Sequence, residues 1–347
     1  MLAPRLLFPG RMLQRFGLLL CPLVLACGGA PDPLERGAAS INPGGLPVGS
    51  LCADHAECES DACGYAGLCV ARRSEVVHAG GDTCGPGEEE GEHESCARTL
   101  SVPLADGSSA ELDKYVITAG RMRAFVERTG GDLRSFVNNL GPDPRWDPTW
   151  TERLPSTMDE LYDALGPWNG NGCYFDGEGA RTYWLPDAVN QAFPDSPHQY
   201  SQDVLDQKAM NCVSFYLLQA FCIWDGGRLA SLDELYAAWG SATYPWGEEA
   251  WDETRVVHNF NYAYPAEALD RTSYVSAPGR RPAGNGPYGH ADLAGLLFQI
   301  SSSVVVDDIV SWSRSGSFEG HEPGVGWTDG MARVYWAAGG RCTYLGQ

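Results

Sequence analysis

Residues 210–238 read MNCVSFYLLQAFCIWDGGRLASLDELYAA, a stretch that predicts two helices separated by a tight break. Ser214 can cap the first helix, whose apolar residues recur at intervals of three and four until Gly226 and Gly227 stop it. Ser231 opens the second helix, and Glu234, three residues later, completes a capping box. Periodicity alone would also fit an amphipathic helical hairpin in many other folds.

Several residues of this stretch resemble the signature of the formylglycine-generating enzyme, or sulfatase-modifying factor, family. The matching positions are Val213-Ser214, Ala220, Cys222, Trp224, Gly227-Arg228-Leu229, Glu234 and Ala238. Further elements of that family follow in order, namely YPWG at 244–247, GPYGHADLAG at 286–295, RSGSF at 314–318 and GRC at 340–342. The resemblance covers about residues 99–347 and implies an α+β fold, the irregular C-type-lectin-like architecture with short helices, few strands and disulfides.

The chain is strongly acidic, with 347 residues and a formal net charge of −21. Phosphate groups would be repelled, so nucleic acid and anionic membrane surfaces are not expected as binding partners. The length and the 44% hydrophobic content are sufficient for a sizeable core.

The N-terminus has the features of an export signal over residues 1–26. Arginines precede an apolar run at 16–26 that is too short for a stable membrane-spanning helix. The sequence Val-Leu-Ala-Cys at 24–27 resembles the bacterial lipobox, which predicts lipid attachment at Cys27 and a flexible linker over 27–50. A plain secretory signal is the alternative. We therefore expect an exported lipoprotein, anchored to a membrane and facing the periplasm or the cell surface.

Cysteine usage agrees with an oxidising compartment. Of the 12 cysteines, Cys21 lies in the predicted signal and Cys27 is the predicted site of lipid attachment. The remaining ten are an even number, which predicts five disulfides. Residues 51–73 form a small cysteine-rich module whose C-x5-C-x4-C-x5-C pattern looks like that of Dickkopf-type proteins. Its pairing is left open, and a zinc site is the weaker alternative because no C-x2-C knuckle is present. The module's cysteines are Cys52, Cys58, Cys63 and Cys69.

Residues 74–98 form an acidic connector. Cys84 and Cys96 bracket the run GPGEEEGEHES and are expected to pair by proximity, making a solvated loop. Calcium could be attracted to such a run, but the acidic residues lack the ordered ligand alternation of a calcium loop.

The positions of the remaining cysteines decide whether the copper chemistry of the family is expected here. In the family, the cysteine of the first helix bonds the cysteine of the closing strand, which implies Cys222–Cys342 and leaves Cys173 to pair with Cys212. The family's oxidases hold copper with two cysteines beyond the GGS element, and here the corresponding stretch FEGHEPGVGWTDGM, residues 318–331, contains none. Copper is therefore not expected, and no catalytic residue is assigned.

The ergothioneine-type branch of the family binds non-haem iron through an HxxxHxE motif. This sequence does not contain that motif. The histidines of residues 99–347 are scattered, at His198, His258, His290 and His321. Glu319, His321 and Glu322 cluster in composition only, in a Gly- and Pro-containing segment that predicts a loop.

Structural calcium is implied by the resemblance. The family's ligands near its DMAGNxWE element correspond to Asp292, Gly295, Leu297 and Gln299, with Asn261 as a candidate for a second site. Gln299 stands where a glutamate is usual, and the loss of that charge weakens a site for a hard cation. Asp292 acting as a helix or turn cap is the alternative.

The function predicted from these observations is a lipid-anchored extracytoplasmic protein whose domain is a non-catalytic binding scaffold. The first alternative is an oxidoreductase of the same family with an altered metal site. The second is a structural surface protein with no specific ligand. The ligand cannot be identified from the sequence, because function depends on site residues and these have changed.

Overall fold

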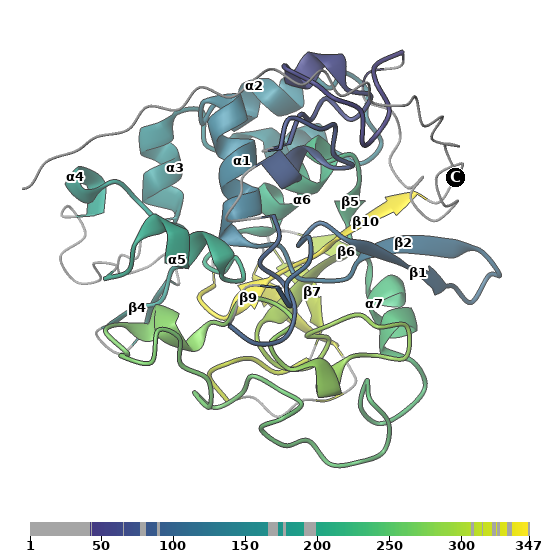
Figure 1. Cartoon of the computed structure of the whole chain (residues 1–347), viewed down its shortest axis with the longest axis vertical. Helices are drawn as coiled ribbons and strands as arrows, with labels where there is room; N and C mark the ends of the chain where they lie inside the picture. Colours follow the sequence, from purple (N-terminus) through teal and green to yellow (C-terminus); the bar gives the residue numbers. More distant parts are fainter. Residues whose placement is uncertain are drawn as a thin grey trace, which may run out of the picture. The chain divides into compact units, whose positions relative to one another are not determined.

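The computed structural model describes residues 42, 44–64, 66–76, 81–88, 91–165, 173–175, 178–190, 199–306, 309–313, 315–320, 324, 327–331 and 335–345. The predicted signal 1–26, Cys27 and most of the linker lie outside these ranges. Within them, short helices and strands alternate with long loops, so the mixed α/β class expected from the sequence is confirmed (Figure 1). No helix in these ranges is long and apolar enough to cross a membrane.

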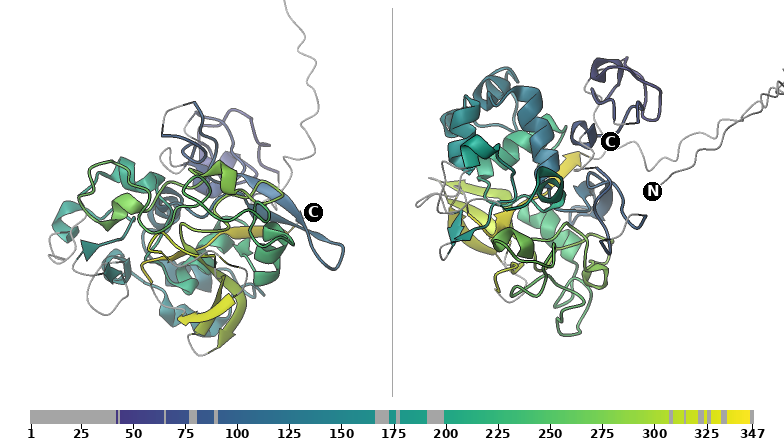
Figure 2. Two further views of the ribbon diagram at one scale, coloured as in Figure 1. Left: turned by 90° about the horizontal axis from the view of Figure 1, so that it is seen from below. Right: turned by 60° about the vertical axis from the view of Figure 1, so that its left-hand side comes forward.

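One sheet brings together strands that are far apart in sequence. Its order is β1-β2-β10-β5, and each neighbouring pair is antiparallel. Thr343 of β10 lies opposite Leu112 of β2 and opposite Arg228 of β5, so the last strand is inserted between two earlier ones. The β1–β2 hairpin extends beyond the rest of this sheet (Figure 2). The strands are β1 Thr99–Pro103, β2 Ser109–Asp113, β5 Arg228–Leu229 and β10 Cys342–Leu345.

A second sheet has the order β8-β7-β6-β9. In it β6 is antiparallel to β7, with a change of register between Ile300 and Val305, and parallel to β9. Ile300 and Val310 are buried in the main core, which lies between this sheet and the helices. The strands are β6 Phe298–Val306, β7 Ile309–Ser313, β8 Trp327–Met331 and β9 Ala338–Gly339, and a separate ribbon pairs β3 Tyr174–Phe175 with β4 Glu178–Gly179.

The helices are short and are ended by local signals. The Thr118 hydroxyl accepts from the N–H of Arg121 at the start of α1, and Gly130, with a φ of 62°, ends that helix in the left-handed conformation. Met122 and Phe125 of α1 are fully buried. The helices are α1 Ala119–Thr129, α2 Leu133–Asn138, α3 Met158–Leu165, α4 Asp187–Asn190, α5 Gln202–Gln207, α6 Phe215–Trp224 and α7 Leu232–Trp239.

The predicted hairpin of residues 210–238 is confirmed as α6 and α7. Ser214 accepts from the N–H of Leu217, and Gly226 adopts a φ of 97° after α6. The capping box between Ser231 and Glu234 is present at the start of α7. Between the helices the chain forms β5, which sequence reasoning missed because its pairing partner, β10, lies more than one hundred residues further along the chain.

All of α6 is buried, whereas its sequence pattern suggested one apolar face. Each residue from Phe215 to Trp224 is buried, and the helix contacts α1, β5 and β6. Phe221 packs edge-on against Phe125, with ring centroids 6.1 Å apart. A helix that is apolar on every side requires protein on every side, and α6 is accordingly central to the core.

Loops dominate between α7 and β6. In the PWG turn the rings of Tyr244 and Trp246 are stacked at 5.0 Å, and the backbones of Tyr244 and Gly247 exchange two hydrogen bonds of 3.0 Å. Further along, short 3-10 turns cover Arg271–Tyr274 and Pro282–Gly284. This segment lies on the side of the domain away from α1 and α2 (Figure 1).

Five disulfides join the ten cysteines of the described chain. The sequence left the pairing in the small module open. There the two bonds interlock: the first cysteine pairs with the third, and the second pairs with the fourth. The other three bonds join the pairs expected from the sequence. The bonds are Cys52–Cys63, Cys58–Cys69, Cys84–Cys96, Cys173–Cys212 and Cys222–Cys342.

The acidic connector packs on the domain more closely than the expected solvated loop. Glu94 accepts from the Tyr115 hydroxyl at 2.5 Å and pairs with Lys114. Arg280 donates to the carbonyl of Gly85 at 2.7 Å and pairs with Glu88 at 3.1 Å. These two carboxylates are therefore neutralised by cations of the domain, which disfavours the calcium alternative for this loop.

Candidate functional site

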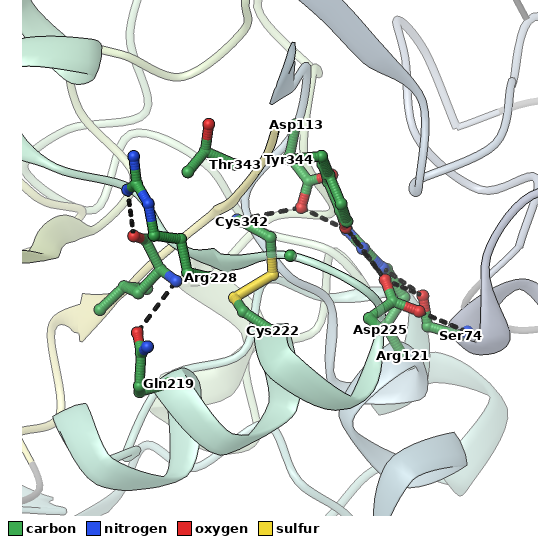
Figure 3. The surroundings of a disulfide bond; sticks show 12 residues. Ser74, Asp113, Arg121, Gln219, Cys222, Asp225, Arg228, Cys342, Thr343 and Tyr344 are labelled. Atoms are coloured by element: carbon green, nitrogen blue, oxygen red, sulfur yellow. Dashed lines mark hydrogen bonds and ion pairs between the residues drawn. A yellow bond between two sulfur atoms is a disulfide. The ribbon is translucent and has the colours of Figure 1, made fainter. Parts of the chain in front are cut away.

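The disulfide that the family resemblance implied lies at the centre of the domain. Cys222 of α6 is bonded to Cys342 of β10, and both residues are fully buried (Figure 3). Gln219, one turn earlier on α6, accepts from the N–H of Leu229 at 3.0 Å, and Leu229 pairs with Cys342 across the sheet. The bond therefore ties the buried helix to a sheet that is already hydrogen-bonded to it.

Beside this disulfide is a buried charge network centred on Arg121 (Figure 3). The guanidinium donates to carboxylate oxygens of Asp113 and Asp225, each at 2.9 Å, and none of these three side chains is exposed. Asp113 also accepts from the N–H of Cys342 at 3.1 Å. Burial lowers the pKa of Arg121, but Asp113, Tyr344 and Asp225 together outweigh burial and raise that pKa, so the residue stays charged.

The network also binds the segment that precedes the predicted domain. The N–H and the hydroxyl of Ser74 donate to the two oxygens of Asp225 at 2.9 and 3.0 Å, and the Ser74 hydroxyl accepts from Arg121 at 2.9 Å. Arg72 lies over the ring of Tyr344, 3.5 Å from its centroid. Arg72 and Ser74 are therefore buried in the domain's interior, although the sequence placed Arg72 in the small module and Ser74 in the connector.

The four oxygens expected to bind calcium all accept hydrogen bonds from the protein. The Asp292 carboxylate accepts from the N–H of Gly279 at 2.6 Å, which makes it a link between loops rather than a helix cap. The carbonyl of Gly295 accepts from the N–H of Leu297 at 2.8 Å. The remaining two bonds are from the Ser315 hydroxyl to the Leu297 carbonyl at 3.2 Å and from Arg341 to Gln299 Oε1 at 2.7 Å.

Arg341 supplies the positive charge at this position. Besides Gln299, its guanidinium donates to the carbonyls of Asp113, Lys114 and Ala291 at 2.8 to 3.0 Å, and more weakly to that of Asp292 at 3.4 Å; Arg341 is fully buried. A dication would have to approach this fixed cation and displace its acceptors. The residues therefore do not fit a calcium ion.

Asn261, the candidate for a second calcium site, closes a turn. Its Oδ1 accepts from the N–H of His258 at 3.0 Å, and its Nδ2 donates to the carbonyl of Val256 at 3.1 Å. Both ends of the amide are thus used by the neighbouring backbone, and this oxygen is no better placed to bind a metal.

The stretch that carries copper cysteines in the family's oxidases is described only in part. Ser317 and Phe318 are buried, and Glu319 accepts from the Tyr335 hydroxyl at 3.1 Å. Burial and then the Glu319 charge raise the pKa of Tyr335 to about 12. His321 and Glu322, the rest of the compositional cluster, lie outside the described residues.

The histidines do not form a metal centre in the part of the chain that is described. His258 lies against Trp251 with ring centroids 4.5 Å apart, and His290 is fully buried; His198 lies outside the described ranges. Within those ranges, the one group of three potential ligands consists of Cys52, Cys58 and Cys69, all of which are in disulfides. This disfavours the zinc alternative for the small module.

Comparison with known proteins identifies the domain. The profile described as "Sulfatase-modifying factor enzyme 1-like domain" matches residues 74–315. The chain belongs to this family. The match begins 25 residues before the predicted boundary at Thr99, at Ser74, which is also the residue that binds Asp225 and Arg121.

Two solved structures resemble this sulfatase-modifying factor domain. One is "Structure of PvdO from Pseudomonas aeruginosa", with 13% identity over 71% of this chain and 90% of that chain and a TM-score of 0.40. The other is "Crystal Structure of CarF", with 10% identity over 69% of this chain and 87% of that chain and a TM-score of 0.38. No curated protein matches the chain significantly.

Sequence reasoning missed the roles of Arg121 and Arg341, two fully buried arginines of this sulfatase-modifying factor domain. Arg341 entered the prediction only through the GRC motif that locates Cys342, and Arg121 was given no role. A signal was present for Arg341, since a charged residue between Gly340 and a disulfide cysteine in a closing strand cannot easily reach solvent. No comparable signal marked Arg121, because its two carboxylates lie 8 and 104 residues away in sequence.

Proposed function

We propose that this protein is a lipid-anchored extracytoplasmic protein whose sulfatase-modifying-factor-like domain binds a ligand or partner without oxidising cysteine. The state of its cysteines supports this proposal. A copper(I) site of the oxidase type requires two thiolates close together. The five disulfides use ten of the 12 cysteines, and the other two, Cys21 and Cys27, belong to the predicted signal and lipid-attachment site.

Breaking a disulfide to free thiols would damage the fold rather than create a site. Cys222 and Cys342 are fully buried beside the Arg121 network, so they present no surface to a peptide substrate. Their separation of 120 residues also makes their bond the largest covalent constraint among the five.

The anchor and the compartment rest on the N-terminal sequence. The lipobox-like Val-Leu-Ala-Cys ends at Cys27, and the Gly- and Pro-containing linker that follows is suited to hold a domain away from a membrane. Stable disulfides in the domain agree with an oxidising compartment.

The test is an oxidation assay. The oxidised protein and a mildly reduced preparation are incubated with copper(I) and a peptide bearing the sulfatase cysteine motif, while oxygen uptake and aldehyde formation are followed. We expect neither preparation to form aldehyde above a protein-free copper control. Aldehyde formation that survives Cys222→Ser with Cys342→Ser would overturn the proposal and favour an oxidoreductase with an altered metal site.

A further inference from the structure

Two adjoining depressions lie on the surface formed by α7, the β1–β2 turn and the loops after α7. Their volumes are about 560 and 680 Å³, and they share Gly240, Ser241 and Tyr288. The second is also lined by residues 103–106 at the end of β1, a strand that contacts α7 (Figure 1). Neither depression contains any residue of the disulfide, the Arg121 network or the predicted calcium set.

Aromatic rings form the walls of these depressions. Tyr288, between them, is 41% exposed. Trp246 is held in place from two sides, because its ring stacks in parallel on Tyr244 and its indole N–H donates to the carbonyl of Glu249 at 2.9 Å. Rings fixed in this way lose little conformational entropy when a ligand packs on them.

Each depression also contains a buried polar atom that no described residue satisfies. Asn285 lines the first depression and Tyr236 lines the second, and neither Asn285 Oδ1 nor the Tyr236 hydroxyl has a hydrogen-bond partner within the described protein. Buried polar atoms are nearly always paired, so these two mark positions where a bound group would gain a hydrogen bond. Asn285 Oδ1 requires a donor.

The charges around the depressions exclude an anionic ligand. Arg228 in the second depression forms two bonds to Glu234, at 2.9 and 2.7 Å, and Arg255 in the first is paired with Glu249. Asp106 and Asp233 line the second depression with exposed carboxylates, of which that of Asp106 already accepts from Ser108. The lining therefore offers acceptors to a neutral ligand that is rich in hydroxyl donors.

We propose that these depressions form one binding surface for a neutral oligosaccharide. A sugar ring has an apolar C–H face that packs on an aromatic ring and a hydroxyl edge that donates to carboxylates and amides. A peptide fits less well, because its carbonyls need donors, whereas the arginines of the lining are already paired with glutamates. This inference rests on the proposed binding function and assigns it a class of ligand.

The experiment titrates maltotriose, cellotriose and triacetylchitotriose into the full mature chain, with tryptophan fluorescence and calorimetry as readouts. We expect at least one to bind with a Kd of about 1 mM or lower. Tyr288→Ala and Asn285→Leu should each weaken that binding at least tenfold. The control is Tyr264→Ala, because Tyr264 is 38% exposed, similar to Tyr288, but lies outside both depressions.

Absence of binding by all three sugars would overturn the inference, as would binding that both site variants leave unchanged. Preferential binding of a sulfated trisaccharide or a peptide would overturn it as well. The aldehyde assay on the same preparation separates the two proposals. Aldehyde formation without sugar binding would reject both the non-catalytic function and the sugar site. Aldehyde formation together with sugar binding would reject only the non-catalytic function.

Discussion

Arg121 connects three parts of the protein through its side chain alone. Its guanidinium lies between Asp113 at the end of β2, Asp225 after α6, and Ser74. Two carboxylates so close together in a buried site would repel each other without the arginine. The network is therefore stable only as a complete set.

We predict that Arg121→Ala lowers the free energy of unfolding by about 3 to 5 kcal/mol, because it leaves buried carboxylates without their counter-charge. The matched control is Arg98→Ala. Arg98 pairs with Glu94 but its side chain is 52% exposed, so the expected loss is about 0 to 1 kcal/mol. Denaturant unfolding under non-reducing conditions measures both, and equal losses for the two variants would contradict the prediction.

Residues whose role is local were predictable, and residues whose role depends on distant partners were not. Asp292 and Gln299 were assigned from a motif, yet their oxygens bond to Gly279 and Arg341, which lie 13 and 42 residues away. Nothing in the motif itself indicates that an arginine from the closing strand would occupy the space of a cation.

At the scale of elements, α6 and α7 were predictable because they depend on local residues, whereas the first sheet was not because it depends on distant ones. Both helices and their caps were predicted because a cap involves residues three or four positions apart. The insertion of β10 between β2 and β5 depends on partners that are more than one hundred residues away in the chain. Pairing between strands that are this far apart in the chain leaves no periodic pattern in the sequence.

The disulfide between α6 and β10 gives a second prediction. Replacing Cys222 and Cys342 by alanine should lower the free energy of unfolding by about 4 to 5 kcal/mol, the chain-entropy value for the 120-residue separation. Tryptophan fluorescence is the readout, since the small module at 51–73 contains no tryptophan.

The control for that measurement replaces Cys52 and Cys63, which are 11 residues apart in the small module. This change should leave the tryptophan-detected midpoint nearly unaltered, because it releases only a local loop. A shift as large as that of the Cys222 and Cys342 variant would show that the module and the domain unfold together.

At the scale of the whole molecule, the domain includes residues from Ser74 to Tyr344 in one buried network. Before Ser74, Arg72 still packs on Tyr344 and Asp61 of the small module still pairs with Arg128 of α1, so the connection to the predicted anchor falls to the predicted linker at 27–50. Cys27→Ser should move the exported protein from the detergent phase to the aqueous phase in a phase-partitioning experiment, because the substitution removes the predicted site of lipid attachment. Unchanged partitioning would show that Cys27 is not the site of lipid attachment.

The pairing of Cys222 with Cys342 also has a consequence for biosynthesis, because the two cysteines are synthesised at different times. At about 5 to 20 residues per second, the ribosome adds Cys342 roughly 6 to 24 s after Cys222. Throughout that interval Cys222 has no native partner, while Cys212, only ten positions earlier, has already met Cys173 or is available for a wrong bond. Correct maturation thus favours an environment in which thiol–disulfide exchange is catalysed, so that early mispairing is reversed once the last strand arrives.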